Sequence, residues 1–165
     1  MRGRNLKVRL LIGAAIAIFF VVKRCNQREV NPYTGKSQAI SLSPEQEIAI
    51  GLQQAPMMAN QHGGLFPNQK AQDLVDKVGK KLVDNSIAKQ SGYNYEFHLL
   101  RDEKSINAFA LPGGQVFITY ALFSQLKNED QLAGVLGHEI GHVLGKHSNE
   151  RITSANFWKL LTMGA

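Results

Sequence analysis

The residues best suited to chemistry lie together in the segment His138-Glu139-Ile140-Gly141-His142. If this segment is helical, His138 and His142 are about 40° and 6 Å apart on one face, so both imidazoles can reach a single metal ion. Glu139 lies about 100° round from His138, displaced enough to avoid ligating the ion and near enough to take a proton from a water beside it. This spacing is typical of zinc-dependent hydrolysis of peptide bonds, with Glu139 as the general base.

The helix that must carry this segment has a clear predicted start at Asn128. Asn128 is a favourable N-cap, and Glu129 and Asp130 place negative charge at the positive end of the helix dipole. One sector of the helix is apolar and includes Glu139, where stability alone would not select a carboxylate. The alternative interpretation makes both histidines core residues and pairs Glu139 with a cation. The apolar positions of this sector are Leu132, Val135, Leu136, Ile140 and Val143.

The opposite flank of the same helix carries Gly134, Gly137 and Gly141. Three glycines inside a helix cost up to about 3 kcal/mol relative to alanine. Such a cost makes sense if another backbone or a ligand approaches closely at this flank. We therefore predict a helix that is buried nearly all round.

The preceding chain predicts two scaffolding helices and a small sheet. Ser43, Pro44 and Gln46 form the start of a helix that runs to about Asn60. The second helix has one buried face. Strands are expected at 93–100, and at 108–111 and 115–120 as a hairpin around Pro112-Gly113-Gly114. The fold class is therefore α+β. The buried face of the second helix consists of Ala71, Leu74, Val75, Val78 and Leu82.

Catalytic zinc needs three protein ligands, and the third is not evident from the residues near the motif. Ser148 stands where an extended motif with a third histidine would have that histidine. His147 misses the position by one residue, and on a continuing helix it would point about 180° from His138. Glu150, at about 120°, is placed little better.

Positive charge is concentrated at the amino terminus. The total is +6, but residues 1–36 hold eight Lys or Arg and one acid, a net of +7, so the other 129 residues carry −1. This distribution argues against nucleic acid as a partner and favours a membrane. The thirteen residues Leu10 to Val22 lack polar side chains. With snorkelling basic residues the usable segment extends from about Leu6 to Cys25, which would span a bilayer.

The organisation predicted from these features has three parts. Residues 1–24 form an uncleaved signal anchor or transmembrane helix, because no small-x-small cleavage site follows the apolar run. Residues 25–42 form a polar, turn-rich linker. Residues 43–165 form the domain that carries the site. The denser basic cluster before the apolar run places this domain outside the cytoplasm, in the periplasm if the source is bacterial.

Several longer stretches resemble the zinc metallopeptidases of the CAAX-prenyl-protease and HtpX type. The resemblance covers about Ser43 to Arg151 and includes the segment from Ile106 to Gly114, the motif helix, and His147-Ser148-Asn149-Glu150-Arg151. The stretch Asn31-Pro32-Tyr33-Thr34-Gly35 before the first helix is similar to bacterial membrane-anchored or periplasmic members.

The resemblance implies a zincin-like fold and a gluzincin site with one Zn²⁺ per subunit. His138 and His142 would be ligands, Glu139 the general base, and a glutamate from a later helix the third ligand. No acid follows Glu150, so we expect further sequence beyond Ala165 or a chain that is inactive alone.

Substrate binding is expected at the strand formed by Asn107, Ala108, Phe109 and Ala110. The family's edge strand would pair with the extended backbone of a protein or peptide substrate, and the alternative is that Phe109 and Leu111 are plain core residues. The implied activity is that of a metalloendopeptidase at or near a membrane, acting in quality control or in processing. The rival hypothesis is a membrane-tethered binding or chaperone module with the same fold and no catalysis.

Overall fold

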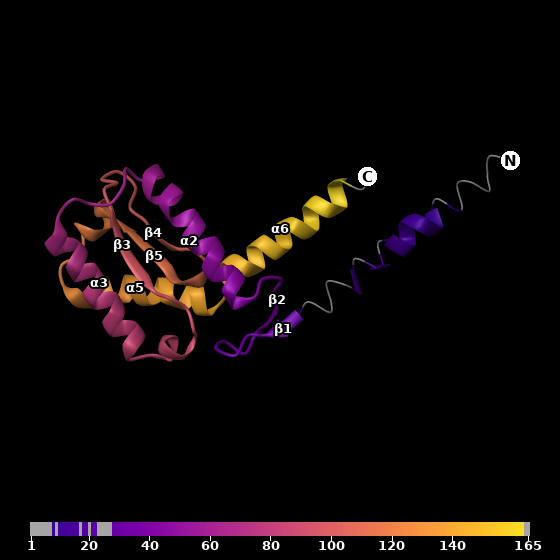
Figure 1. The fold of residues 1–165 in the computed structure, drawn as a ribbon, viewed down its shortest axis with the longest axis horizontal. Helices are drawn as coiled ribbons and strands as arrows, with labels where there is room; N and C mark the ends of the chain where they lie inside the picture. The colour runs from indigo at the N-terminus through magenta and orange to yellow at the C-terminus, as the bar shows by residue number, and fades with distance from the viewer. Residues whose placement is uncertain (1–7, 9, 17, 20, 23–27, 164–165) are drawn as a thin grey trace.

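The structure is a computed structural model that describes residues 8, 10–16, 18–19, 21–22 and 28–163, with side chains up to Ala155. A three-stranded sheet lies at the centre of the domain, with helices on both sides (Figure 1). Its strands are β3 (Glu96–Leu100), β4 (Ala108–Ala110) and β5 (Gln115–Thr119), in the order β3-β5-β4. β5 is parallel to β3 and antiparallel to β4, which confirms the predicted hairpin. β4 is therefore an edge strand of this sheet.

One face of the sheet is covered by α3 (Gln69–Asp84) and α5 (Glu129–Leu144), which also contact each other. Alternate residues of β3 and β5 point toward these helices, as the two-residue period of a strand requires. The predicted apolar sector of α5 supplies the helix side of this core, so the periodicity prediction is confirmed. The core residues are Val75, Val78, Phe97, Leu99, Val116, Ile118, Leu132, Leu136 and Ile140.

The other face of the sheet is aromatic and lies beside α2 (Pro44–Gln61). The Phe117 ring stacks on His98 and on Phe109, at centroid distances of 4.8 and 4.9 Å. The predicted cap of α2 is present, since Ser43 accepts from the Gln46 amide while the Gln46 side chain accepts from the Ser43 amide. α2 also packs against the turn between β4 and β5, the short 3-10 helix η2 (Pro112–Gly114).

Gly113 explains how closely α2 can approach this turn. Its φ is +78°, and an added Cβ would lie 2.4 Å from the Ile48 Cα atom and 2.6 Å from the Ile48 nitrogen. Both the backbone conformation and the lack of space exclude a side chain here. The turn therefore fixes α2 against the hairpin that contains the edge strand.

A second, two-stranded sheet lies in the segment that the sequence predicts to be a linker. β1 (Arg28–Val30) and β2 (Ser37–Ala39) pair antiparallel around the Asn31-Pro32-Tyr33-Thr34-Gly35 turn. Asn31 and Gln38 are only 0% and 4% exposed. The polar, turn-rich composition of this segment favoured a linker. In the structure Asn31 and Gln38 are instead buried against the end of α5. A local sequence pattern carries no information on contacts with residues more than 100 positions away.

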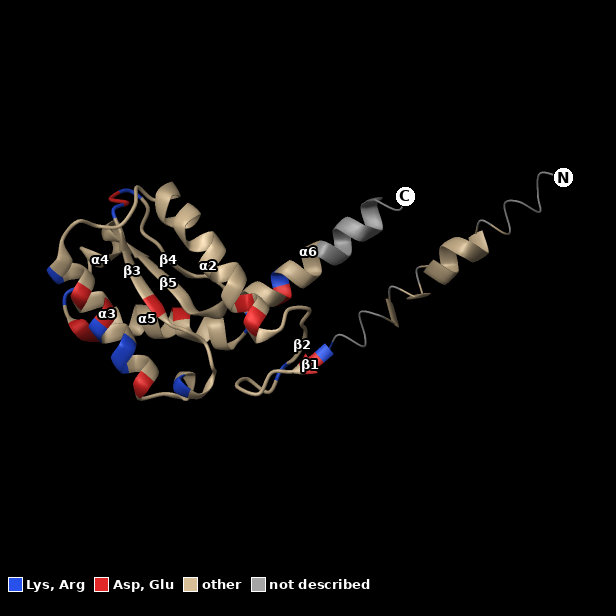
Figure 2. Ribbon diagram, in the orientation of Figure 1, with Lys and Arg blue, Asp and Glu red and all other residues tan. Residues whose placement is uncertain are grey.

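The remaining helices extend this framework toward the carboxyl end. The short helix α4 (Tyr120–Phe123) follows β5, and α6 (His147–Met163) follows α5 and projects away from the sheet (Figure 1). Figure 2 shows acidic and basic residues interspersed along α3.

The predicted amino-terminal anchor lies partly outside the described residues, since 1–7, 9, 17, 20 and 23–27 are not described. None of the helices in the described ranges combines the length and apolar composition that a bilayer crossing requires. In the described part of the segment the apolar side chains are exposed. They include Leu10, Leu11, Ile12, Ile16, Ile18, Val21 and Val22.

Candidate active site

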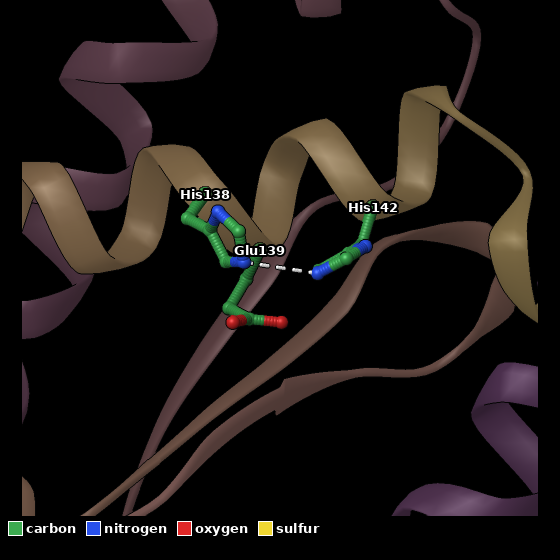
Figure 3. Close-up of side chains that lie close together, drawn as sticks. All are labelled: His138, Glu139 and His142. Carbon is green, nitrogen blue, oxygen red and sulfur yellow. Dashed lines mark hydrogen bonds between the residues drawn. The ribbon is translucent and has the colours of Figure 1, made fainter.

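Helix α5 begins as the sequence predicts and carries all three motif residues. The Asn128 side chain accepts from the Gln131 amide at 2.9 Å, which caps the helix. His138 and His142 lie one turn apart on its surface, and their Nε2 atoms are 3.0 Å apart (Figure 3). The candidate ligand atoms of His138, Glu139 and His142 all lie within 4.8 Å of one another. The structure thus brings the three residues together as predicted.

The Glu139 carboxylate lies below the two imidazoles in Figure 3. The residue is 8% exposed, and in the described part of the chain its carboxylate makes no hydrogen bond or ion pair. A buried carboxylate without a partner costs stability. Among the described residues, Glu139 has no cation partner, so the alternative interpretation of this residue is wrong for this part of the chain.

The two histidines fit a zinc ion. Two nitrogens on a tetrahedral zinc, each about 2.0–2.1 Å from the metal, are about 3.3 Å apart. The 3.0 Å separation of the two Nε2 atoms is close to this value. Neutral imidazole nitrogens and carboxylate oxygens are also ligands that suit zinc.

A groove of about 550 Å³ opens beside the motif, between the edge strand and α5. His138 and Glu139 are among its lining residues, so the groove leads to the motif. Asn107 and Ala108 lie in its wall, whereas Phe109 stacks within the sheet against Phe117. The other lining residues are mostly apolar or small, and are Ile106, Leu122, Leu126, Gln131, Gly134 and Val135.

The glycine flank of α5 is open, which differs from the buried helix that the sequence predicts. An added Cβ at Gly134, Gly137 or Gly141 would meet nothing within 4 Å. The prediction that another backbone approaches these glycines is therefore wrong for the described residues. The other predicted reason for them, close approach of a ligand, agrees with the position of Gly134 in the groove wall.

The end of α5 places His147 beside the site, which the continuing-helix assumption did not anticipate. The helix ends at Leu144, Gly145 is its C-cap, and Lys146 has a φ of +51° before α6 begins. His147 consequently turns back, and its Nδ1 lies 2.5 Å from the Nδ1 of His142. Burial, followed by the nearby His142, lowers the pKa of His147. His147 lies beside Nδ1 of His142, the ring nitrogen that does not contact His138.

Buried polar residues hold this junction in place. Asn31 donates to the Leu144 carbonyl and Gln38 donates to the Gly145 carbonyl, each at 2.8 Å, which satisfies two carbonyls that a helix end leaves free. Gln38 also donates to the Glu150 carboxylate at 3.2 Å, so Glu150 is engaged away from the histidine pair.

A second buried group fixes Lys146. The Lys146 ammonium lies 3.6 Å from the Glu47 carboxylate, and the Tyr93 hydroxyl donates to the same carboxylate at 2.6 Å. Burial, together with the hydrogen bond to Glu47, raises the pKa of Tyr93. The sequence alone did not indicate the contacts among Glu47, Tyr93 and Lys146, or those of Asn31 and Gln38. The one sequence signal for them was the Asn31–Gly35 stretch of the family resemblance.

Residues 69–165 match the model of peptidase family M48, and the chain belongs to this family. The match covers α3, the three-stranded sheet, α5 and α6, and it includes the residues that line the groove and the motif helix. The resemblance described from the sequence is thus confirmed at the level of the zinc metallopeptidase family.

Curated relatives of the chain are named as metalloendopeptidases or proteases. It is 31% identical over 142 residues to mitochondrial metalloendopeptidase OMA1 of Saccharomyces cerevisiae, which covers 79% of this chain and 41% of the relative. It is 33% identical over 120 residues to the beta-barrel assembly-enhancing protease of Yersinia pestis, with 73% of this chain and 24% of the relative covered. The chain therefore spans less than half the length of either relative.

Proposed function

We propose that this chain carries the metal-binding helix of a zinc-dependent metalloendopeptidase that hydrolyses peptide bonds of protein substrates. One observation carries the proposal. Two imidazoles converge beside the largely buried residue Glu139, whose carboxylate has no described partner, and His138 and Glu139 line an open groove. The proposal extends to a role in protein quality control at or near a membrane, and the relatives named above as proteases support the peptidase part of it. The narrower CAAX-prenyl-protease or HtpX type stays a prediction.

His138 and His142 would hold the ion, and the family resemblance implies a glutamate from a later helix as the third ligand. When bound, zinc polarises the substrate carbonyl and lowers the pKa of a water toward about 7. Glu139 takes the proton of the attacking water as its oxygen bonds to the carbonyl carbon. Glu139 then gives this proton to the leaving amine as the carbon–nitrogen bond breaks. The free carboxylate of Glu139 is suited to both transfers.

The edge strand and the groove would position the substrate. β4 pairs with β5 along one side, and in the described sheet its other side has no strand beside it. An extended substrate could add there by main-chain hydrogen bonds, next to Asn107, Ala108, Phe109 and Ala110. A substrate side chain beside the cleaved bond would then enter the groove.

The amino-terminal segment supports the membrane part of the proposal. Its described apolar side chains are exposed, and its described helical turns lie away from the domain in Figure 1. Burial in a bilayer would remove this apolar surface from water. With the basic cluster on the cytoplasmic side, the domain would be extracytoplasmic.

Removing metal tests the proposal directly. We expect the protein that includes the later glutamate ligand to contain about one zinc per chain and to cleave casein, because three protein ligands with a water make a catalytic zinc site. A chelator should reduce cleavage to the level of a blank, and added Zn²⁺ should restore it. The His98→Gln variant is a control, because His98 lies away from the motif against Gln115 and Phe117. Full cleavage by metal-free protein would contradict the proposal, whereas zinc uptake without cleavage would favour the binding-module alternative.

Filling the groove should change which substrates are cleaved. A leucine at Gly134 has free space and raises helix propensity, so we expect Gly134→Leu to fold. The ratio of kcat/KM for peptides with a large versus a small apolar residue beside the cleaved bond should fall about 10- to 100-fold, as expected for lost pocket volume.

The matched control is Gly137→Leu, which lies on the same helix and also has open space but is not in the groove wall. Its selectivity ratio should equal that of the wild type. Peptide libraries read by mass spectrometry measure both ratios. An unchanged preference in Gly134→Leu would show that the groove does not take the substrate side chain.

A further inference from the structure

We propose that His147 is a positioning residue for the metal site, which accepts a hydrogen bond from His142 and so directs the other nitrogen of His142 toward the ion. This inference rests on the proposed function, because it assumes that His138 and His142 bind zinc. It concerns a residue that lies beyond the HExxH motif and that would not itself touch the metal.

Both nitrogens of the His142 ring are engaged. Its Nε2 lies 3.0 Å from Nε2 of His138, and its Nδ1 lies 2.5 Å from Nδ1 of His147. A neutral imidazole has one N–H and one free lone pair. If Nε2 binds the ion it has no proton, so Nδ1 must carry the N–H and donate it to His147. A ligand histidine held through its second nitrogen keeps its tautomer and ring orientation fixed.

Gly145 gives independent evidence that the chain reserves space for the His147 ring. Its φ of −68° is helical, so the backbone itself would accept a side chain. An added Cβ would nevertheless lie 2.8 Å from Nε2 and 3.1 Å from Cδ2 of His147. The backbone oxygen of Gly141, at 3.0 Å, also lies close to this Cβ, so a side chain at Gly145 would require the His147 ring to move.

The buried contacts of the junction explain why His147 stays there although it is exposed. Lys146 adopts a φ of +51°, which is uncommon for a residue other than glycine. The buried Glu47 carboxylate holds its ammonium, and Gln38 holds the preceding carbonyl of Gly145. The turn that aims His147 at His142 is thus fixed by residues from α2 and β2.

The test compares zinc affinity in variants of the zinc-binding protein. Competition with a chromophoric chelator should show about 10- to 100-fold weaker zinc binding in His147→Ala, the range typical of a lost partner of a ligand histidine. His147→Gln retains an acceptor and should restore most of the affinity. Ser148→Ala, one residue further along α6, should match the wild type.

Gly145→Ala provides a second variant that leaves His147 in the chain but displaces its ring. It should weaken zinc binding in the same direction as His147→Ala, with little change in Tm because alanine suits the helical φ. In zinc-loaded wild type, ¹⁵N-resolved NMR should show a protonated Nδ1 on His142, with a signal that moves in both variants. A positioning role predicts weaker zinc binding and a shifted His142 Nδ1 signal at nearly unchanged Tm. A merely structural role predicts a lower Tm instead.

Each outcome bears on the inference. Wild-type zinc affinity in both His147→Ala and Gly145→Ala would overturn it while leaving the proposed function intact. Equal losses in His147→Ala and His147→Gln at unchanged Tm would overturn it too, since His147 would then bind the ion itself. A wild-type protein that takes up no zinc would instead defeat the proposed function. If His147→Ala does not fold, Gly145→Ala and the NMR signal decide.

Discussion

The Glu139→Gln variant is expected to bind zinc as the wild type does and to lose peptide cleavage by about 10² to 10⁴-fold in kcat, the usual contribution of a general acid–base residue. Glutamine has nearly the same shape but cannot take the proton of the attacking water. The histidine pair, with Nε2 atoms 3.0 Å apart, is unchanged by this substitution. Casein cleavage and zinc content, measured on the same preparation, check both expectations.

The same variant should be at least as stable as the wild type. Glu139 is 8% exposed and has no hydrogen bond or ion pair in the described part of the chain, so glutamine removes a buried charge and breaks no contact. Glu129→Gln is the control, because Glu129 lies on the same helix and is exposed. It should cleave casein normally. Residual cleavage by Glu139→Gln at the wild-type rate would refute the assigned role.

The largest expected effect on stability comes from Asn31→Ala. Asn31 is 0% exposed, donates to the Leu144 carbonyl at 2.8 Å and accepts from the amides of Tyr33 and Thr34. Alanine would remove the donor to two buried acceptors, the Leu144 carbonyl and the Gln38 side-chain oxygen, and would open a small cavity. We expect the free energy of unfolding to fall by about 2–4 kcal/mol, since each unsatisfied buried group costs about 1–3 kcal/mol.

Urea denaturation measures this difference, and Asn94→Ala is a suitable control. Asn94 is an exposed loop residue, so its removal should change stability by less than about 0.5 kcal/mol. A loss in Asn31→Ala as small as in the control would mean that the hairpin does not support α5.

The parts of the site that follow local geometry could be predicted from the sequence. The spacing of His138 and His142 fixes their separation on any helix, and Asn128 marks where that helix starts. The apolar periodicity of α5 also identified its buried sector, because burial of one helix face leaves a period of 3.6 residues.

The parts that depend on distant contacts could not be predicted in this way. The bond from Asn31 to Leu144 joins residues 113 positions apart, and nothing near Asn31 distinguishes a buried turn from a linker. Lysine is not a residue type that indicates a positive φ, so nothing in the sequence indicated that the helix ends before His147. On a helix assumed to continue, His147 was expected to point away from His138. A glycine in a sequence is compatible with a crowded position or with an open one. For this reason the sequence did not show that Gly134, Gly137 and Gly141 lie on an open flank of α5.

The hairpin that holds the end of α5 also has a mechanical consequence. It directly follows residues 1–27 in the chain, and it grips the carbonyl of Leu144, two residues beyond His142. Tension on the amino-terminal segment would therefore reach the end of this helix that carries His142 through a few hydrogen bonds. We expect such tension to disturb the candidate metal site before the central sheet.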